Sequence, residues 1–185
     1  MKLKTYQKAI LMLVPFAVIQ GCASNATIEG MTANPGVTHN QKLVSKVNVE
    51  KVQGGRQTNP MWTSQVSNEN FQGALVNSLK NAKLYNNKAD SEYLLDAVLV
   101  DTDQDLFGIN LTVKLDVDYN LINKADGKSI YQKEIKNSYT AGMGDSVIGV
   151  KRLRLANEGA ARENIEQFIK SLDKVDLKKQ SISVG

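Results

Sequence analysis

Hydrophobic residues in the first part of the chain follow the period of a strand and then that of a helix. Leu43, Val47 and Val49 recur at even spacing before Gly54-Gly55, which predicts a strand that ends in a turn. Ser67 is a suitable helix cap, and a helix is expected after it. The apolar face of this helix recurs at steps of three and four residues: Phe71, Ala74, Leu75, Ser78, Leu79 and Ala82.

The middle of the chain has the pattern of three strands. Residues 93–100, YLLDAVLV, are rich in branched apolar side chains and indicate a central strand that is buried on much of both faces. Residues 110–121 alternate strictly between apolar and polar, so one face of this strand must be buried. Its apolar members are Leu111, Val113, Leu115, Val117, Tyr119 and Leu121. Asp126-Gly127 then supplies a hairpin turn, and Tyr131, Ile135 and Tyr139 continue on the returning strand.

A long helix is expected from about residue 150 to residue 175. Its stripe at steps of three and four consists of Leu153, Asn157, Ala160, Ala161, Ile165, Phe168 and Leu172. The small residues 159–161 would let the helix approach a sheet closely. The order strand, helix, three strands, helix predicts an α+β two-layer sandwich, with a four-stranded, mostly antiparallel sheet and both helices on one face.

The first 22 residues have the parts of a secretory signal peptide. Three lysines precede an apolar run that begins at Ala9, and a small residue, Gly21, stands before Cys22, the only cysteine of the chain. An uncleaved membrane span is an alternative, but it would need about 20 apolar residues, and Pro15 interrupts this shorter run. An ordinary core cysteine is a second alternative, which the position of Cys22 after a signal-like segment disfavours.

The sequence Val18-Ile19-Gln20-Gly21-Cys22 resembles the bacterial lipobox. In that motif a branched apolar residue and a small residue precede the cysteine, as Ile19 and Gly21 do here, and signal peptidase recognises them. The cysteine receives the lipid, because its thiolate attacks the lipid donor. The resemblance implies that the mature chain begins at Cys22 and that a lipid on this residue holds it to a membrane.

Loss of the signal peptide changes the charge balance. Residues 1–21 contain three of the 23 basic residues and none of the 19 acidic ones, so the mature chain has a net charge of only +1. A nucleic-acid partner is not expected, because phosphate binding needs a clustered basic face. With the one thiol lipidated, no disulfide can form within the chain.

Composition divides the chain into four segments. Residues 1–21 are the expected signal peptide, and residues 22–41 a lipidated flexible tether, because small and polar residues dominate it. Residues 42–175 form the α+β domain. Residues 176–185 are polar without helical periodicity and are expected to be a disordered tail.

This order of elements behind a lipobox resembles several small lipoproteins of the Gram-negative outer membrane. They include the lipopolysaccharide-assembly lipoprotein, the activators of penicillin-binding proteins and the auxiliary lipoproteins of envelope transporters. Residues 154–172, RLANEGAARENIEQFIKSL, are similar to the closing helix of uncharacterised lipoproteins in this group. The resemblance implies an envelope protein partner of unknown identity and no named catalytic site. Ala23 is not the Asp that retains lipoproteins in the inner membrane, so the outer membrane is the implied location.

Two segments have partial signatures of ligand sites. Asp101, Asp103 and Asp105 have the opening spacing of a calcium loop, but Leu106 and Thr112 replace its glycine and its closing carboxylate. A solvated turn is expected there, and no metal. The Gly-rich residues 141–146 precede a helix, as in phosphate-binding loops, but lack the Lys-Ser/Thr ending, so a flexible connection is expected. No cofactor is expected.

Three cations stand near the start of the last helix. Lys151, Arg152 and Arg154 oppose the helix dipole, and one hypothesis is that they contact a lipid headgroup or an acidic partner surface. The alternative is that they are exposed and screened. The sole histidine, His39, has no acidic or nucleophilic neighbour in sequence, and no catalytic role is expected for it.

The sequence thus favours a lipid-anchored, non-enzymatic accessory protein on the periplasmic side of the outer membrane. One alternative is an envelope hydrolase whose catalytic groups meet only in the fold. Another is a lipid or small-ligand carrier. A pocket of about 300 Å³ or more between sheet and helices would favour the carrier, and a filled core with an apolar surface patch would favour an interaction module.

Overall fold

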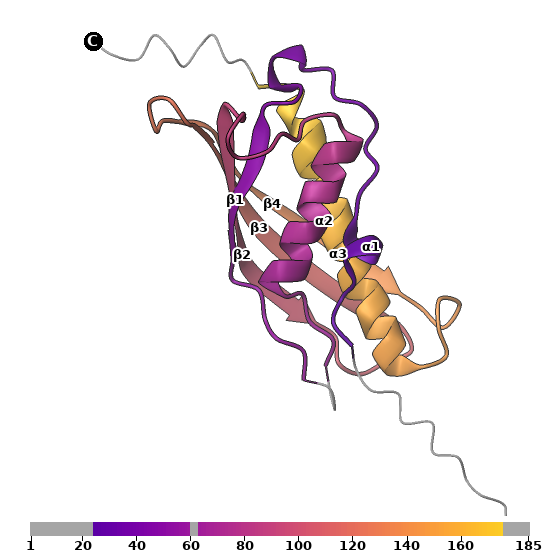
Figure 1. Ribbon diagram of the computed structural model, residues 1–185. Helices are drawn as coiled ribbons and strands as arrows, with labels where there is room; N and C mark the ends of the chain where they lie inside the picture. Colours follow the sequence, from indigo (N-terminus) through magenta and orange to yellow (C-terminus); the bar gives the residue numbers. More distant parts are fainter. Residues whose placement is uncertain (1–23, 60–62, 176–185) are drawn as a thin grey trace, which may run out of the picture.

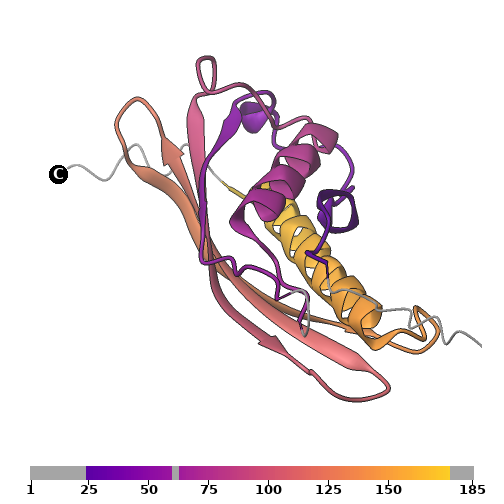
Figure 2. The ribbon, with the colours of Figure 1, turned by 60° about the horizontal axis from the view of Figure 1, so that its bottom comes forward.

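A single sheet and a layer of helices form the domain (Figure 1). The computed structural model describes residues 24–59 and 63–175. The main helices, α2 (Asn68–Asn81) and α3 (Gly149–Leu172), lie side by side on one face of the four-stranded sheet (Figures 1 and 2). The predicted α+β two-layer sandwich is therefore confirmed.

The four strands lie in the sheet in their chain order. They are β1 (Val47–Gln53), β2 (Tyr93–Gln104), β3 (Leu111–Asn123) and β4 (Ser129–Ala141). β1 and β2 are parallel and α2 connects them, whereas the pairs β2–β3 and β3–β4 are antiparallel. The prediction that residues 93–100 form a central strand is confirmed.

The alternation in β3 determines which face of the sheet is buried. All six of its predicted apolar residues are at most 3% exposed. β2 differs from its prediction, because Val98 and Val100 are 38% and 56% exposed while Leu95, Ala97 and Leu99 are buried. The helices cover one face only, so branched residues on the other face of β2 fit an extended strand without being buried.

The boundaries of the elements follow local signals. The Ser67 hydroxyl accepts a hydrogen bond from the backbone N–H of Asn70 and caps α2, as predicted. Gly127 has a φ of 69° in the turn between β3 and β4, which glycine adopts without strain. Leu43 lies in a short 3-10 helix, η1 (Gln41–Leu43), rather than in the first strand.

An aromatic stack and a buried amide fill the space between β3, β4 and α3. The rings of Tyr119 and Phe168 stack with centroids 4.0 Å apart. The Asn164 amide donates to the carbonyl oxygens of Leu115 at 3.2 Å and Ile135 at 2.9 Å, and its Oδ1 accepts from the Tyr119 hydroxyl at 2.9 Å. Burial raises the pKa of Tyr119 well above its usual value. The predicted buried stripe of α3 is confirmed in full.

The flexible tether predicted for residues 22–41 is wrong for residues 24–41, which pack against the domain. We call residues 24–41 the arm. It contains a short helix, α1 (Ile28–Met31), and Ala26, Met31 and Ala33 are fully buried. Polar side chains of α2 and α3 satisfy its backbone, so the arm is ordered although it offers few large apolar residues. The predictions for Ile19, Gly21, Cys22 and residues 176–185 lie outside the described residues.

Close approach of α3 to β4 requires the glycine at position 159. A Cβ atom there would lie closer than 3.0 Å to three carbons of the Tyr139 ring. The expectation that residues 159–161 permit close packing is confirmed, since Ala160 and Ala161 are fully buried.

We expect Gly159→Ala to destabilise the domain. Overpacking costs about 1–3 kcal/mol, which exceeds the roughly 0.5–1 kcal/mol that alanine contributes inside a helix. Urea unfolding of the variant measures the difference. Gly144→Ala is the control, because nothing lies within 4 Å of a Cβ at that position. A Gly159→Ala domain as stable as the parent would contradict the described packing.

Candidate interaction surface

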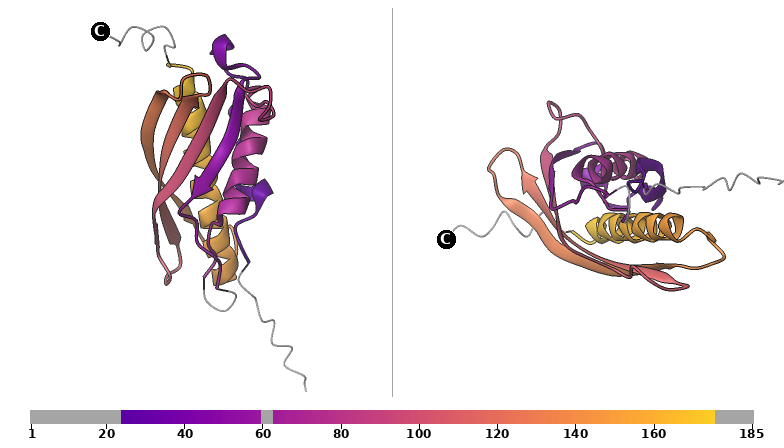
Figure 3. Two further views of the ribbon diagram at one scale, coloured as in Figure 1. Left: turned by 60° about the vertical axis from the view of Figure 1, so that its left-hand side comes forward. Right: turned by 90° about the horizontal axis from the view of Figure 1, so that it is seen from below.

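A row of charged residues on α3 holds the arm. Arg154, Glu158 and Arg162 are spaced by four residues, so they lie along one side of the helix. The arm passes over the face of the helices that is turned away from the sheet (Figure 3). α3 therefore contacts the sheet on one side and the arm on another.

Glu158 makes the central contact of this row. It is 5% exposed, and its Oε1 accepts hydrogen bonds from the backbone N–H and the hydroxyl of Thr27, each at 2.9 Å. Arg154 donates to the Ser24 hydroxyl at 2.9 Å, and its Nε lies 3.6 Å from Glu158 Oε1. A buried carboxylate with charged and neutral donors around it is a strong interaction.

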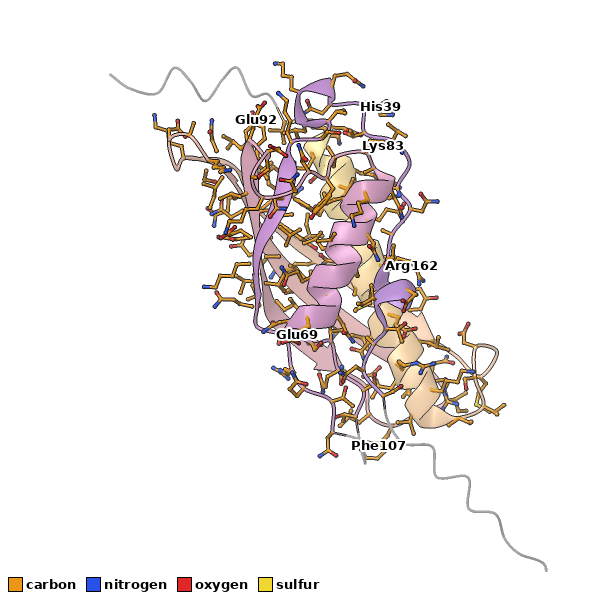
Figure 4. All side chains as sticks on the ribbon, in the orientation of Figure 1. His39, Glu69, Lys83, Glu92, Phe107 and Arg162 are labelled. Carbon is orange, nitrogen blue, oxygen red and sulfur yellow. The ribbon has the colours of Figure 1, made fainter. Side chains whose placement is uncertain are left out.

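The rest of the arm is held at regular intervals. Arg162, labelled in Figure 4, donates to the Gly30 carbonyl at 2.7 Å. From α2, the Ser78 hydroxyl accepts from the backbone N–H of Ala33 at 2.8 Å. At the far end of α3, Asp173 accepts from the Thr38 hydroxyl and from the backbone N–H of His39. The arm therefore runs from the second turn of α3 to its end.

Exposed apolar residues gather at the end of the molecule where α3 begins. They lie in the β2–β3 hairpin, residues 105–110, and in the β4–α3 loop, residues 142–148. Figures 2 and 3 show both loops at this end of the molecule. Their exposed fractions range from 45% to 92%. We call this set the apolar tip: Leu106, Phe107, Ile109, Met143, Val147 and Ile148.

Arg152 joins the two loops of the apolar tip. Its guanidinium donates to the carbonyl oxygens of Gly108 at 3.1 Å and Ser146 at 2.9 Å, and it contacts Met143 Sδ at 3.1 Å. The side chain is 6% exposed and forms no ion pair among the described residues. The Arg152 guanidinium therefore binds backbone carbonyl groups of the two loops and not an external anion.

The three cations predicted to form an anion contact do not act together. Arg152 is buried beneath the apolar tip, Arg154 holds the arm, and only Lys151 is exposed. The prediction of a shared lipid or partner contact is therefore wrong for Arg152. Its physical reason is that chain turns near the helix start leave carbonyl groups that need donors.

The aspartates with calcium-loop spacing and the Gly-rich segment form ion pairs or hydrogen bonds within the domain. Asp103 pairs with Lys114 at 3.2 Å across β2 and β3, and Asp105 accepts from the backbone N–H of Thr112. Asp145 accepts from the backbone N–H of Gly142 at 2.8 Å, so a carboxylate of the loop itself takes the place that an anion would need. Within residues 24–59 and 63–175, no group of three or more potential metal ligands occurs.

Three hollows on the surface of the described domain are open to solvent. One of about 540 Å³ lies at the ends of β2 and β3 that are remote from the apolar tip, beside Tyr93 and Lys124. Another of about 380 Å³ lies beside β4 and the end of α3, where the hydroxyl groups of Tyr131 and Ser171 are hydrogen bonded and close the edge between the layers. A small hollow of about 190 Å³ lies between the loops of the apolar tip, beside Arg152.

Comparison with known proteins identifies the fold. No protein-family model matches the chain, and no curated protein sequence is significantly similar to it. The chain is similar in structure to protein XCC0632 of Xanthomonas campestris, of the DUF330 family: the TM-score is 0.56, the identity 12%, and the match covers 78% of this chain and 95% of that one.

A second similar structure is named as a "putative lipoprotein" from Caulobacter crescentus. Its TM-score is 0.51 at 16% identity, over 72% of this chain and 91% of that one. Likeness at this identity shows a shared fold. Among the described residues, no helix is long and apolar enough to cross a membrane.

Sequence reasoning missed both the arm contacts and the apolar tip. The four-residue spacing of Arg154, Glu158 and Arg162 was a readable signal, since it placed charged residues beside the buried stripe of α3. Phe107 and Ile109 stood in a predicted turn, where large apolar residues have no core to enter. That their hairpin lies at the same end of the molecule as the β4–α3 loop depends on the pairing of β3 with β4.

We expect Glu158→Ala to release the arm. Loss of the carboxylate leaves the backbone N–H of Thr27 without its acceptor, which should lower the free energy of unfolding by about 2–3 kcal/mol. Limited proteolysis should then cut within residues 24–41. Glu166→Ala is the matched control, because Glu166 also pairs four residues along the helix, with Lys170, at the surface; it should cost less than about 0.5 kcal/mol. Equal effects of the two variants would refute the role of Glu158.

We expect Arg152→Lys to loosen the apolar tip. A lysine ammonium lacks the planar fork that reaches two carbonyl groups at once, so stability should fall by about 1–3 kcal/mol. Hydrogen exchange measured by mass spectrometry should rise in residues 105–110 and 142–148 and stay constant in β3. Lys151→Arg, an exposed change of the same kind, is the control. Unchanged exchange in both loops would show that Arg152 does not join them.

Proposed function

We propose that this protein is a lipid-anchored accessory lipoprotein on the periplasmic face of the outer membrane and that it acts as an interaction module without catalysing a reaction. The observation that carries the proposal is the lipobox-like sequence at residues 18–22, with Cys22 as the only thiol of the chain. Ala23 in the position after it supports the outer membrane as the location.

The fold supports the same class of protein. A structure with a related fold, from the Gram-negative bacterium Caulobacter crescentus, bears the name "putative lipoprotein". The described domain also begins almost directly after the cysteine, because Ser24 is already bonded to Ser64 and Arg154. A domain held so close to its anchor suits a protein that works at the membrane surface.

The packing of the domain favours an interaction module over a carrier. Tyr119, Phe168 and Asn164 fill the space between the sheet and α3. The hollow of about 380 Å³ between β4 and the end of α3 opens at the surface, and the hydrogen bond between Tyr131 and Ser171 separates it from this filled interior. The largest exposed apolar set lies instead at the surface, in the apolar tip. Crosslinking in intact cells, followed by mass spectrometry, would identify the protein partner.

We expect the lipid anchor to depend on one sulfur atom. Cys22→Ser should leave the chain uncleaved at this site and without acyl mass, because a hydroxyl is a far weaker nucleophile than a thiolate. Intact-mass measurement of the purified product checks this. In the same experiment, Ala23→Asp should keep the lipid but move the protein to the inner-membrane fraction of a density gradient.

Two results would contradict the proposal. A native product that begins at Met1 and carries no acyl mass would remove the anchor. A lipidated protein found in the inner-membrane fraction even with Ala23 would keep the anchor and remove the outer-membrane location.

A further inference from the structure

The apolar tip has the composition of a membrane-inserting surface. Phe107, Ile109 and Val147 are 92%, 71% and 77% exposed, values far above those of core residues. Residues 106–110 and 146–150 contain no charged side chain. An exposed apolar cluster of this kind marks a contact with another apolar surface.

The start of the described chain lies at the same end of the molecule. Arg152 holds Gly108 and Ser146 of the apolar tip, and Arg154, two residues further along α3, holds Ser24. Two residues advance a helix by only about 3 Å. The first two turns of α3 therefore connect the apolar tip to the amino end of the arm.

The lipid of Cys22 cannot be far from this end. The two peptide links from Cys22 to Ser24 span at most about 7 Å, even when fully extended. Because Ser24 is fixed to the domain by two side-chain contacts, the membrane surface must pass close to it whenever the lipid is inserted. The anchor thus limits which surfaces of the domain can reach the bilayer, and the apolar tip is among them.

We propose that the apolar tip inserts into the interfacial layer of the bilayer that holds the Cys22 lipid, so that the domain stands on the membrane in one orientation. This inference rests on the proposed lipid anchor. Large apolar side chains, aromatic ones included, partition favourably into that layer, at a depth of about 5–10 Å. The Arg152 contacts fix both loops before insertion, so little conformational freedom is lost on binding.

Charge identifies the lipid class that suits the apolar tip. Asp105 precedes the first apolar segment, and Asp145 lies between Met143 and Val147 in the second. Of the two neighbouring basic side chains, Arg152 is occupied by carbonyl groups and Lys151 is exposed, so the apolar tip has more acidic than free basic charge around it. Insertion should therefore depend on apolar contact and not on anionic headgroups.

The test uses the full lipidated chain in vesicles, with one fluorescent label per variant. Phe107→Cys and Val147→Cys are labelled with an environment-sensitive dye, since the acylated Cys22 has no free thiol. Val37→Cys is the matched control: Val37 is apolar and 57% exposed, but lies near His39 at the opposite end from Phe107 (Figure 4). Val100→Cys is a second control, because Val100 is exposed on the face of the sheet that the helices do not cover. It tests whether that face, rather than the apolar tip, contacts the membrane.

The vesicles contain phosphatidylethanolamine and phosphatidylcholine, with or without phosphatidylglycerol, and a lipid that carries a quenching spin label. We expect labels at positions 107 and 147 to emit at shorter wavelength and to lose intensity to the spin-labelled lipid in both compositions. Labels at positions 37 and 100 should keep the emission of a dye in water. A spin label near the headgroup should quench positions 107 and 147 more than one at the end of an acyl chain.

Three outcomes would overturn the inference, and they can be told apart. Equal emission at positions 107 and 37, in a protein whose acyl mass is intact, would refute insertion and leave the proposed lipid anchor standing. A shift at position 107 without quenching by the lipid would mean that a second protein copy covers the apolar tip. A chain without acyl mass would refute the anchor and the inference together.

Discussion

The position of the arm on the domain depends on one contact, in which the buried carboxylate of Glu158 binds Thr27. This contact, together with Arg154 and Arg162 on either side, holds the arm along α3. α3 is consequently covered on two sides, by the sheet and by the arm, which explains why a helix of 24 residues has 13 buried ones. Because the arm begins beside the first two turns of α3, the same contact limits where the proposed membrane anchor can lie relative to the domain.

The regular elements were predictable because their signals are local. The alternation in β3, the Ser67 cap and the stripe of α3 each depend on residues that are neighbours in the chain, and each was confirmed. The exposed Val98 and Val100 were harder to foresee, since β-branched residues favour a strand whether or not the face is covered.

The arm contacts and the apolar tip were not predicted, because their local signals in the sequence are weak and their placement depends on long-range pairing. Low hydrophobicity in residues 24–41 indicated disorder, but hydrogen bonds from α2 and α3 replace the missing apolar contacts. Arg152 looked like an exposed cation at an unfavourable helix position, and only the fold shows that two distant loops bring carbonyl groups to it. In both cases the sequence did not reveal that a charged side chain, Glu158 or Arg152, is buried and hydrogen bonded to a distant segment.

The separation of Thr27 from Glu158 by 131 residues also implies an order of events on the proposed export route. If the chain is exported behind a signal peptide, the residues next to Cys22 emerge long before the helix that binds Thr27. Until Glu158 arrives, Thr27 has no docking place, so the neighbouring cysteine would remain open to enzymes that acylate and cleave the chain. Chain connectivity alone would then place the modification before the docking of the arm.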